Sequence, residues 1–235
     1  MISILLPVYN AEKYLKRCLE SIDSQTSSEY QIIIVDDAST DLSKSIIKEY
    51  KEKNRKKIKV YENNMNMGLS YNRNKLIELC DTKYFIFVDA DDTINNNLIA
   101  EIKKIIDKDN PDIIRYQSML YKSGAEPENK YKCPSFTNEI GEKAVKKMLL
   151  NDKIFGQTWM YCYSKNLFIE NNLQYPNGKV QEDYRLTICA IYLAKKVTSI
   201  DYIGYNYYRN PNSIMEDKST GSLLKKANDV LSHYD

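Results

Sequence analysis

Apolar runs of strand length alternate with amphipathic stretches through the first part of the chain. The runs are Ile2–Val8, Gln31–Val35, Ile58–Tyr61 and Tyr84–Val88. The longer runs are apolar at nearly every position, as expected for strands buried on both faces. The stretches between them repeat apolar residues at helical spacing; they are residues 11–22, 39–50 and 69–80. This alternation predicts an α/β protein with an open, mostly parallel central sheet that is flanked by helices.

Polar residues mark where the first helices should begin. Asn10 precedes the first amphipathic stretch and suits the N-cap position, because its side chain can accept a backbone N–H of the first turn. Residues 39–41, a Ser-Thr-Asp run, precede the second stretch in the same way. Gly68 predicts a turn before the third helix.

The pattern is weaker after Pro111. It predicts strands over 113–121 and 159–163, helices over 142–150 and 181–194, a helical turn over 166–171 and a long loop or hairpin over 122–138. Residues 221–235 are polar and helix-like. We therefore expect two halves, 1–110 and 111–215, and a helical tail over 216–235 that could be truncated relative to the natural gene.

Composition argues against several kinds of partner and chemistry. The 235 residues carry 34 Lys and Arg against 32 Asp and Glu, a net charge of +2, which does not indicate a nucleic-acid-binding protein. The single histidine, His233, lies near the end of the chain. The chain therefore has almost no histidine for a Ser-His or Cys-His catalytic pair or for a zinc site. Carboxylates must carry any catalysis.

Cysteine usage and hydropathy predict a cytoplasmic chain. The five cysteines are far apart and form no Cys-x-x-Cys pair, which is typical of reduced, buried thiols. Met1 leads directly into an apolar run without a basic leader or a cleavage site, so no secretory signal is expected. No run approaches the roughly 20 apolar residues that span a bilayer. Peripheral contact with the inner face of the membrane stays open, because the basic run 51–57 either faces solvent or meets anionic lipid.

Three loops should meet at one edge of the predicted sheet. Residues 7–10, 36–37 and 89–92 follow the first, second and fourth strands, and ligands of such sheets bind at the carboxyl ends of the strands. The Asp-x-Asp of 89–91 can direct two oxygen ligands at Mg²⁺ or Mn²⁺, although acidic loops are also common as solvated turns. The Asp-Asp pair at 36–37 can accept hydrogen bonds from a base imide or a ribose hydroxyl.

Several motifs share the order and spacing of a known enzyme family. They are Ser3–Asn10, Leu19–Thr26, Ile34–Asp41, Asn66–Asn74 and Phe87–Asp92. Together they resemble the opening of the inverting family 2 glycosyltransferases. A sparser likeness continues through Trp159 and residues 163–168, 181–183 and 207–213. The resemblance implies a GT-A fold, with a nucleotide-sugar-binding half over 1–110 and an acceptor-binding half with the catalytic base over 111–215.

The resemblance also implies a donor site for a nucleotide sugar, usually a UDP-sugar. The residues that it places against the donor are Pro7, Val8, Tyr9, Asn10, Glu12, Asp36, Asp37, Arg73, Asp89, Ala90 and Asp91. Among them, Asp37 takes the base with Asp36 beside it, and Asp89 faces the ribose or the sugar. Arg73 either contacts a phosphate or structures its loop.

The remaining roles that the resemblance implies are metal binding, catalysis and acceptor binding. Asp91, with Asp89, binds Mn²⁺ or Mg²⁺. Glu182 and Asp183 are the implied catalytic residues, and Asp183 is the base; helix capping explains such a pair equally well. On the acceptor side the implied residues are Trp159, Tyr208 and Arg209. The acceptor is then a growing bacterial surface glycan, such as capsule or lipopolysaccharide, or a lipid-linked saccharide.

A carboxylate mechanism is consistent with this assignment. Glycoside hydrolases need a general acid because an alcohol leaves, whereas a nucleoside diphosphate leaves as an anion. A metal at Asp91 can neutralise that charge, so a single base at Asp183 suffices to take the proton of the attacking hydroxyl. Attack from the face opposite the leaving group predicts inversion at the anomeric carbon.

Other classes of protein fit less well. A phospho-receiver domain also has an acidic pair after one strand and an Asp after a later strand, but here a full strand and helix precede the pair and Glu182-Asp183 would be unexplained. A sugar-phosphate nucleotidyltransferase should carry a glycine-rich loop after the first strand, and residues 7–10 contain no glycine. A catalytically inactive binding module stays open.

Tyrosine is the commonest aromatic residue, with 20 Tyr against 5 Phe and 1 Trp. A cluster at Tyr202, Tyr205, Tyr207 and Tyr208 follows Trp159 along the chain. These side chains either stack on acceptor sugars or fill the faces of a strand, and the sequence does not decide between the two.

Overall fold

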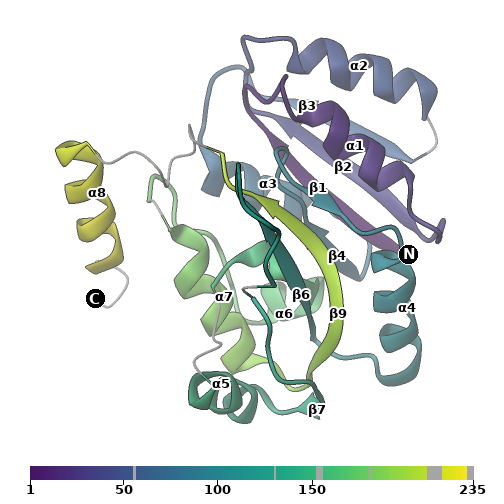
Figure 1. The fold of residues 1–235 in the computed structure, drawn as a ribbon, viewed down its shortest axis with the longest axis vertical. Coiled ribbons are helices and arrows are strands. Elements are labelled where there is room, and N and C mark those ends of the chain that lie inside the picture. The colour runs from purple at the N-terminus through teal and green to yellow at the C-terminus, as the bar shows by residue number, and fades with distance from the viewer. Residues whose placement is uncertain (55–56, 130, 152–155, 180, 211–218, 232–235) are drawn as a thin grey trace.

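The computed structural model describes residues 1–54, 57–129, 131–151, 156–179, 181–210 and 219–231. Within these residues one sheet of nine strands runs in the order β3-β2-β1-β4-β8-β6-β9-β5, and β7 pairs with β9. Helices lie on the outside of this sheet, and α8 stands apart from it (Figure 1). Of the predicted tail, α8 (Thr220–Leu231) is helical. His233, residues 211–213 of the acceptor-side likeness and 55–56 of the basic run lie outside the described residues.

The first half of the sheet has the predicted topology. β1 (Ile2–Val8), β2 (Tyr30–Asp36), β3 (Ile58–Glu62) and β4 (Tyr84–Phe87) are parallel neighbours. β1, β2 and β4 are buried at every position, because helices cover both faces. In the β1–β2 register Val8 lies beside Asp36, so the loops after these strands start at the same edge.

Four helices belong to this half, and the start of the first differs from prediction. They are α1 (Leu15–Asp23), α2 (Ser43–Lys53), α3 (Leu69–Leu79) and α4 (Leu98–Asp109). Asn10 is not the N-cap of α1; it adopts a left-handed conformation (φ 47°), and its side-chain oxygen accepts the backbone N–H of Thr40. Asp41 accepts the N–H of Ser43 at the start of α2. The sequence pattern missed α4 and the short β5 (Thr93–Ile94).

The second half adds mostly antiparallel strands. Its elements are β6 (Ile113–Tyr121), β7 (Phe136–Glu139), α5 (Gly141–Leu150), β8 (Tyr161–Ser164), α6 (Lys165–Glu170), α7 (Glu182–Leu193) and β9 (Val197–Tyr208). β8 pairs antiparallel with both β4 and β6, so it joins the two halves into one sheet. The expected strand over 159–163 starts two residues later, after a 3₁₀ turn at Thr158–Met160. None of the helices in the described part of the chain combines the length and the hydropathy of a membrane span.

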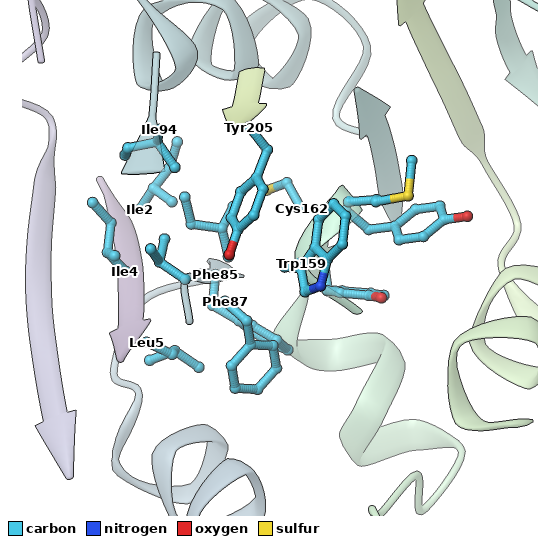
Figure 2. Close-up of a cluster of buried hydrophobic side chains, with 14 of the residues drawn as sticks. Ile2, Ile4, Leu5, Phe85, Phe87, Ile94, Trp159, Cys162 and Tyr205 are labelled. Carbon is cyan, nitrogen blue, oxygen red and sulfur yellow. The ribbon is translucent and has the colours of Figure 1, made fainter. Parts of the chain in front are cut away.

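An aromatic core fills the junction of the halves (Figure 2). The Trp159 ring stacks on Tyr205, with ring centroids 4.5 Å apart and an interplanar angle of 15°. Phe85 of β4 stacks on Tyr163 of β8 at 5.5 Å. Trp159 is 4% exposed and Tyr205 is fully buried, so both pack as core residues. The core therefore extends to the end of β4, where the acidic loop begins.

Candidate active site

The loops after β1, β2 and β4 converge with the start of α7. The backbone N–H of Asp37 donates to Val8 O at 2.8 Å, and that of Val88 donates to Leu5 O at 3.0 Å. Arg73 of α3 reaches both Asp89 and the first residue of α7. The structure thus brings together segments that are separated by more than 100 residues, as in the 109-residue separation of Arg73 and Glu182.

Hydrogen bonds join the loop after β1 to the loop after β2. Glu12 accepts the N–H of Leu42 at 3.0 Å and its own N–H donates to Asp41 at 2.9 Å. Tyr9 is 50% exposed, whereas Val8 is buried in the strand. Ala38, next to the acidic pair, adopts a left-handed conformation (φ 59°) that costs a residue with a Cβ about 1–3 kcal/mol. Such backbone strain is commonest at functional sites.

Asp37 fixes the loop that leads into α3. Its carboxylate, 2% exposed, accepts hydrogen bonds from the Asn63 amide at 2.7 Å and from the N–H groups of Met67 and Gly68 at 2.8 and 2.9 Å. Gly68 has φ 87°, which a glycine adopts without strain. The sequence does not indicate that Asp37 anchors the loop before α3. The predicted contact of Asp37 with a base stays a prediction.

Unlike Asp37, Asp36 accepts hydrogen bonds from the described residues through one of its two carboxylate oxygens. It is fully buried, and its Oδ2 accepts the N–H of Ser39 at 3.0 Å. Its Oδ1 is buried without a hydrogen-bond donor among the described residues. An unpaired buried carboxylate oxygen is energetically costly.

The acidic loop, residues 89–92, concentrates negative charge at the end of β4. Burial raises the pKa of Asp91, and the nearby carboxylate of Asp89 raises it further. Two partly buried carboxylates that repel each other gain most from a cation, and oxygen ligands suit Mg²⁺ or Mn²⁺. The described residues contain no group of three or more His, Cys, Asp or Glu that could hold a metal. Any cation here must therefore take further ligands from water or substrate, as Mg²⁺ usually does.

Arg73 lies between the acidic loop and α7. Its guanidinium, 2% exposed, contacts Glu182 Oε1 at 2.5 Å and Asp89 Oδ1 at 3.3 Å. It is also packed against the Phe87 and Tyr175 rings. Since both terminal nitrogens face carboxylates, Arg73 joins the two sides of the site. Direct contact of Arg73 with a phosphate stays a prediction.

Glu182 and Asp183 open α7, as the sequence predicts. Glu182 is 6% exposed and is held by Arg73, whereas Asp183 is half-buried. Burial raises the pKa of Asp183; the Arg73 guanidinium opposes this effect, and the carboxylates of Glu182 and Asp89 add to it. A carboxylate with a raised pKa is a stronger proton acceptor than an ordinary aspartate, which suits a general base.

The residues expected to bind the acceptor have different surroundings. Trp159 lies in the core, as described above. Tyr208 stacks on Tyr121 at 4.7 Å, and the Arg17 guanidinium lies 3.7 Å from its ring centroid. Arg209 is exposed. Arg17 could not be recognised as a site residue from the sequence, because it lies in an ordinary amphipathic helix. In the structure its side chain donates to Asp91 O at 2.6 Å.

Comparison with known proteins identifies the family. The model of the family described as Glycosyl transferase family 2 matches residues 3–173. The chain belongs to glycosyl transferase family 2. This membership confirms the resemblance found in the sequence motifs.

Curated relatives of this family 2 glycosyltransferase are longer proteins. Glycosyltransferase GlyA of Streptococcus pneumoniae is 29% identical over 220 residues, which cover 88% of this chain and 30% of GlyA. The poly(ribitol-phosphate) beta-glucosyltransferase of Bacillus spizizenii is 31% identical over 212 residues, which cover 88% of this chain and 32% of that protein. The chain thus spans less than a third of the length of both.

Solved structures confirm the predicted GT-A fold of the glycosyltransferase. Staphylococcus aureus TarS 1–349 in complex with UDP-GlcNAc has a TM-score of 0.78 at 21% identity, over 98% of this chain and 66% of that chain. The mannosyltransferase PcManGT of Pyrobaculum calidifontis, in complex with GDP-Man and Mn²⁺, has a TM-score of 0.67 at 13% identity, over 99% of this chain and 62% of that chain.

Proposed function

We propose that this family 2 glycosyltransferase transfers a hexose or N-acetylhexosamine from a UDP-sugar to a hydroxyl of a bacterial surface glycan, with a divalent metal and with inversion. The observation that carries the proposal is the link from Asp89 through the buried Arg73 to Glu182, the residue that precedes Asp183 in α7. It sets an acidic loop suited to a metal beside a carboxylate suited to act as a base.

The donor lies across the loops that follow β1 and β2. Tyr9 offers an exposed ring against which the base or the ribose can pack. UDP is favoured as the nucleotide because the similar TarS structures contain UDP-GlcNAc and UDP.

Asp91, with Asp89, would hold Mn²⁺ or Mg²⁺. The repulsion between the two carboxylates and their oxygen chemistry fit a hard cation. When bound, the ion supplies positive charge that stabilises the leaving diphosphate. The Mn²⁺ in the PcManGT structure, which has the same fold, supports this choice.

Asp183 takes the proton of the attacking acceptor hydroxyl. Glu182 cannot share this role while its carboxylate is buried and bound to Arg73. A single base opposite the leaving group displaces it with inversion, and no general acid is needed because the diphosphate leaves as an anion.

The acceptor and the cellular location are proposed from the relatives. Two relatives act on poly(ribitol-phosphate), and a third is a processive diacylglycerol transferase of Mycoplasma genitalium. Ribitol phosphate polymers and diacylglycerol both offer hydroxyl groups as acceptors. We therefore place the chain in the cytoplasm, in peripheral contact with the inner face of the membrane, and assign it no nucleic-acid partner.

Release of UDP from UDP-sugars tests the proposal. With UDP-GlcNAc, UDP-glucose and UDP-galactose as donors, at least one should yield UDP when Mn²⁺ or Mg²⁺ is present, and EDTA should abolish the release. GDP-mannose provides the control for nucleotide choice. A protein that binds UDP-sugars but releases no UDP with any acceptor or with water would be a catalytically inactive binding module, and the proposal would be wrong.

A further inference from the structure

The end of β9 lies beside the acidic loop, and one tyrosine of that strand contacts both ends of the loop. The Tyr205 hydroxyl donates to Asp92 Oδ2 at 2.8 Å and accepts the backbone N–H of Asp89 at 3.1 Å. A single phenol therefore ties the first residue of the loop to the last. Phenylalanine at this position could make neither contact.

Asp92 continues this connection into the strand. Its Oδ1 accepts the backbone N–H of Tyr208 at 2.8 Å, and its side chain is 1% exposed. Both carboxylate oxygens of Asp92 thus face donors from β9. Asp92 therefore anchors the loop to β9.

Two further side chains hold Asp91 in the middle of the loop. The Asn210 amide donates to Asp91 Oδ2 at 2.6 Å. Arg17 donates to Asp91 O, and its guanidinium lies over the Tyr208 ring. The orientation of the Asp91 carboxylate thus depends on the end of β9 and the residues just after it.

The position of the Tyr205 hydroxyl is fixed by the core. Its ring is fully buried and stacks on Trp159 (Figure 2). The preceding residue, Gly204, also packs closely against the core, because a Cβ there would lie 2.4 Å from Leu98 Cδ1 and 3.1 Å from Tyr116 Cδ2. A phenol held this tightly cannot follow the loop if the loop moves, so the loop is held where Tyr205 places it.

We propose that Tyr205 is a positioning residue for the acidic loop: through its hydroxyl it sets the backbone of Asp89 and the anchor Asp92, and hence the direction in which Asp91 faces the cation and the diphosphate. The proposal rests on the proposed function, which supplies the cation and donor. It gives the tyrosine-rich end of β9 a role that neither an acceptor platform nor the filling of strand faces provides.

The test compares Tyr205→Phe with a matched control, Tyr84→Phe. Tyr84 is the first residue of β4, is 3% exposed, and donates its hydroxyl to Pro111 O at 2.7 Å, at the opposite end of that strand from the acidic loop. In each full-length variant, Mn²⁺ binding in the presence of UDP is measured from the EPR signal of free Mn²⁺. Thermal unfolding measures the structural cost of losing a buried hydroxyl.

Tyr205→Phe should weaken Mn²⁺ affinity by about 10–100-fold, the usual effect of removing an outer partner of a metal ligand, while UDP affinity without metal stays unchanged. Tyr84→Phe should lose a similar amount of thermal stability to Tyr205→Phe but should bind Mn²⁺ with wild-type affinity. If Tyr205→Phe binds Mn²⁺ as tightly as the wild type, or if both variants lose the same Mn²⁺ affinity, Tyr205 is not a positioning residue. Either result would leave the proposed function standing.

Two further outcomes keep the test decisive. A wild-type protein that binds neither UDP nor Mn²⁺ would overturn the proposed function and this inference with it. If Tyr205→Phe fails to fold, Asn210→Ala replaces it, because Asn210 is only partly buried and contacts Asp91 directly. The proposal requires that contacts from the end of β9 and the residues just after it set the Asp91 carboxylate. Weaker Mn²⁺ binding by Asn210→Ala supports this requirement, and unchanged binding overturns the proposal.

Discussion

Asp183→Asn should lower the turnover of UDP-sugar by about 10²–10⁴-fold, the usual contribution of a general base. Asparagine has nearly the same shape but cannot accept the proton of the acceptor hydroxyl. The helix start, the Arg73–Glu182 pair and the loops after β1 and β2 stay in place, so donor binding should be spared. Steady-state UDP release and UDP-sugar binding by calorimetry measure the two quantities separately.

Asp112→Asn is a matched control for this substitution. Asp112 is a partly buried aspartate whose carboxylate accepts the N–H groups of Lys195 and Lys196 at 2.7 and 3.0 Å. It precedes β6 at the end of the sheet away from the acidic loop, so its variant should turn over like the wild type. Wild-type turnover by Asp183→Asn would remove Asp183 from the mechanism.

The same carboxylate should set the acid side of the pH–rate profile. Asp183 acts as a base only when deprotonated, and its pKa is raised, chiefly by burial. Activity should therefore fall on acidification at a pH well above about 3.9, the ordinary aspartate value. A rate that stays level down to that pH would contradict the assignment.

Arg73→Met should destabilise the fold by about 3–5 kcal/mol, because it leaves the carboxylate of Glu182 buried without its partner. It should also lower turnover, since Arg73 joins the acidic loop to the helix that carries the base. Urea unfolding followed by circular dichroism measures the change in the free energy of unfolding. A variant as stable as the wild type would show that the pair does not hold the site together.

A double-mutant cycle separates the ion pair from the loss of packing. Glu182→Gln removes the charge that Arg73 neutralises, so adding Arg73→Met to it should cost less than Arg73→Met alone. Additive losses would show that packing of the Arg73 stem against Phe87 and Tyr175, rather than the ion pair, accounts for the effect.

The first half of the fold was predictable because its signals are local. Continuous apolar strands, amphipathic helices and short connections define a parallel sheet, and this sheet places residues 7–10, 36–37 and 89–92 at one edge. Asn10 shows the limit of local reasoning. Its side chain suits an N-cap, but in the structure it accepts the backbone N–H of Thr40, which is distant in the sequence.

The second half was less predictable because its contacts are long-range. β9 pairs with β6, β5 and β7 from distant parts of the chain, and neither its bounds nor its neighbours follow from periodicity. The position of Trp159 in the core and the hold of Tyr205 on the acidic loop follow from that pairing. The motif residues Asp183 and Arg73 were found by resemblance, whereas their link through Glu182 needed the structure.

The configuration of the first sugar product tests the central claim most directly. Proton NMR of the reaction, with the UDP-sugar that gives the fastest metal-dependent release of UDP, identifies the anomer formed before mutarotation. A single base opposite the leaving group predicts that an α-linked donor yields the β-anomer or a β-linked product. Formation of the α-anomer would contradict a one-step displacement that uses Asp183.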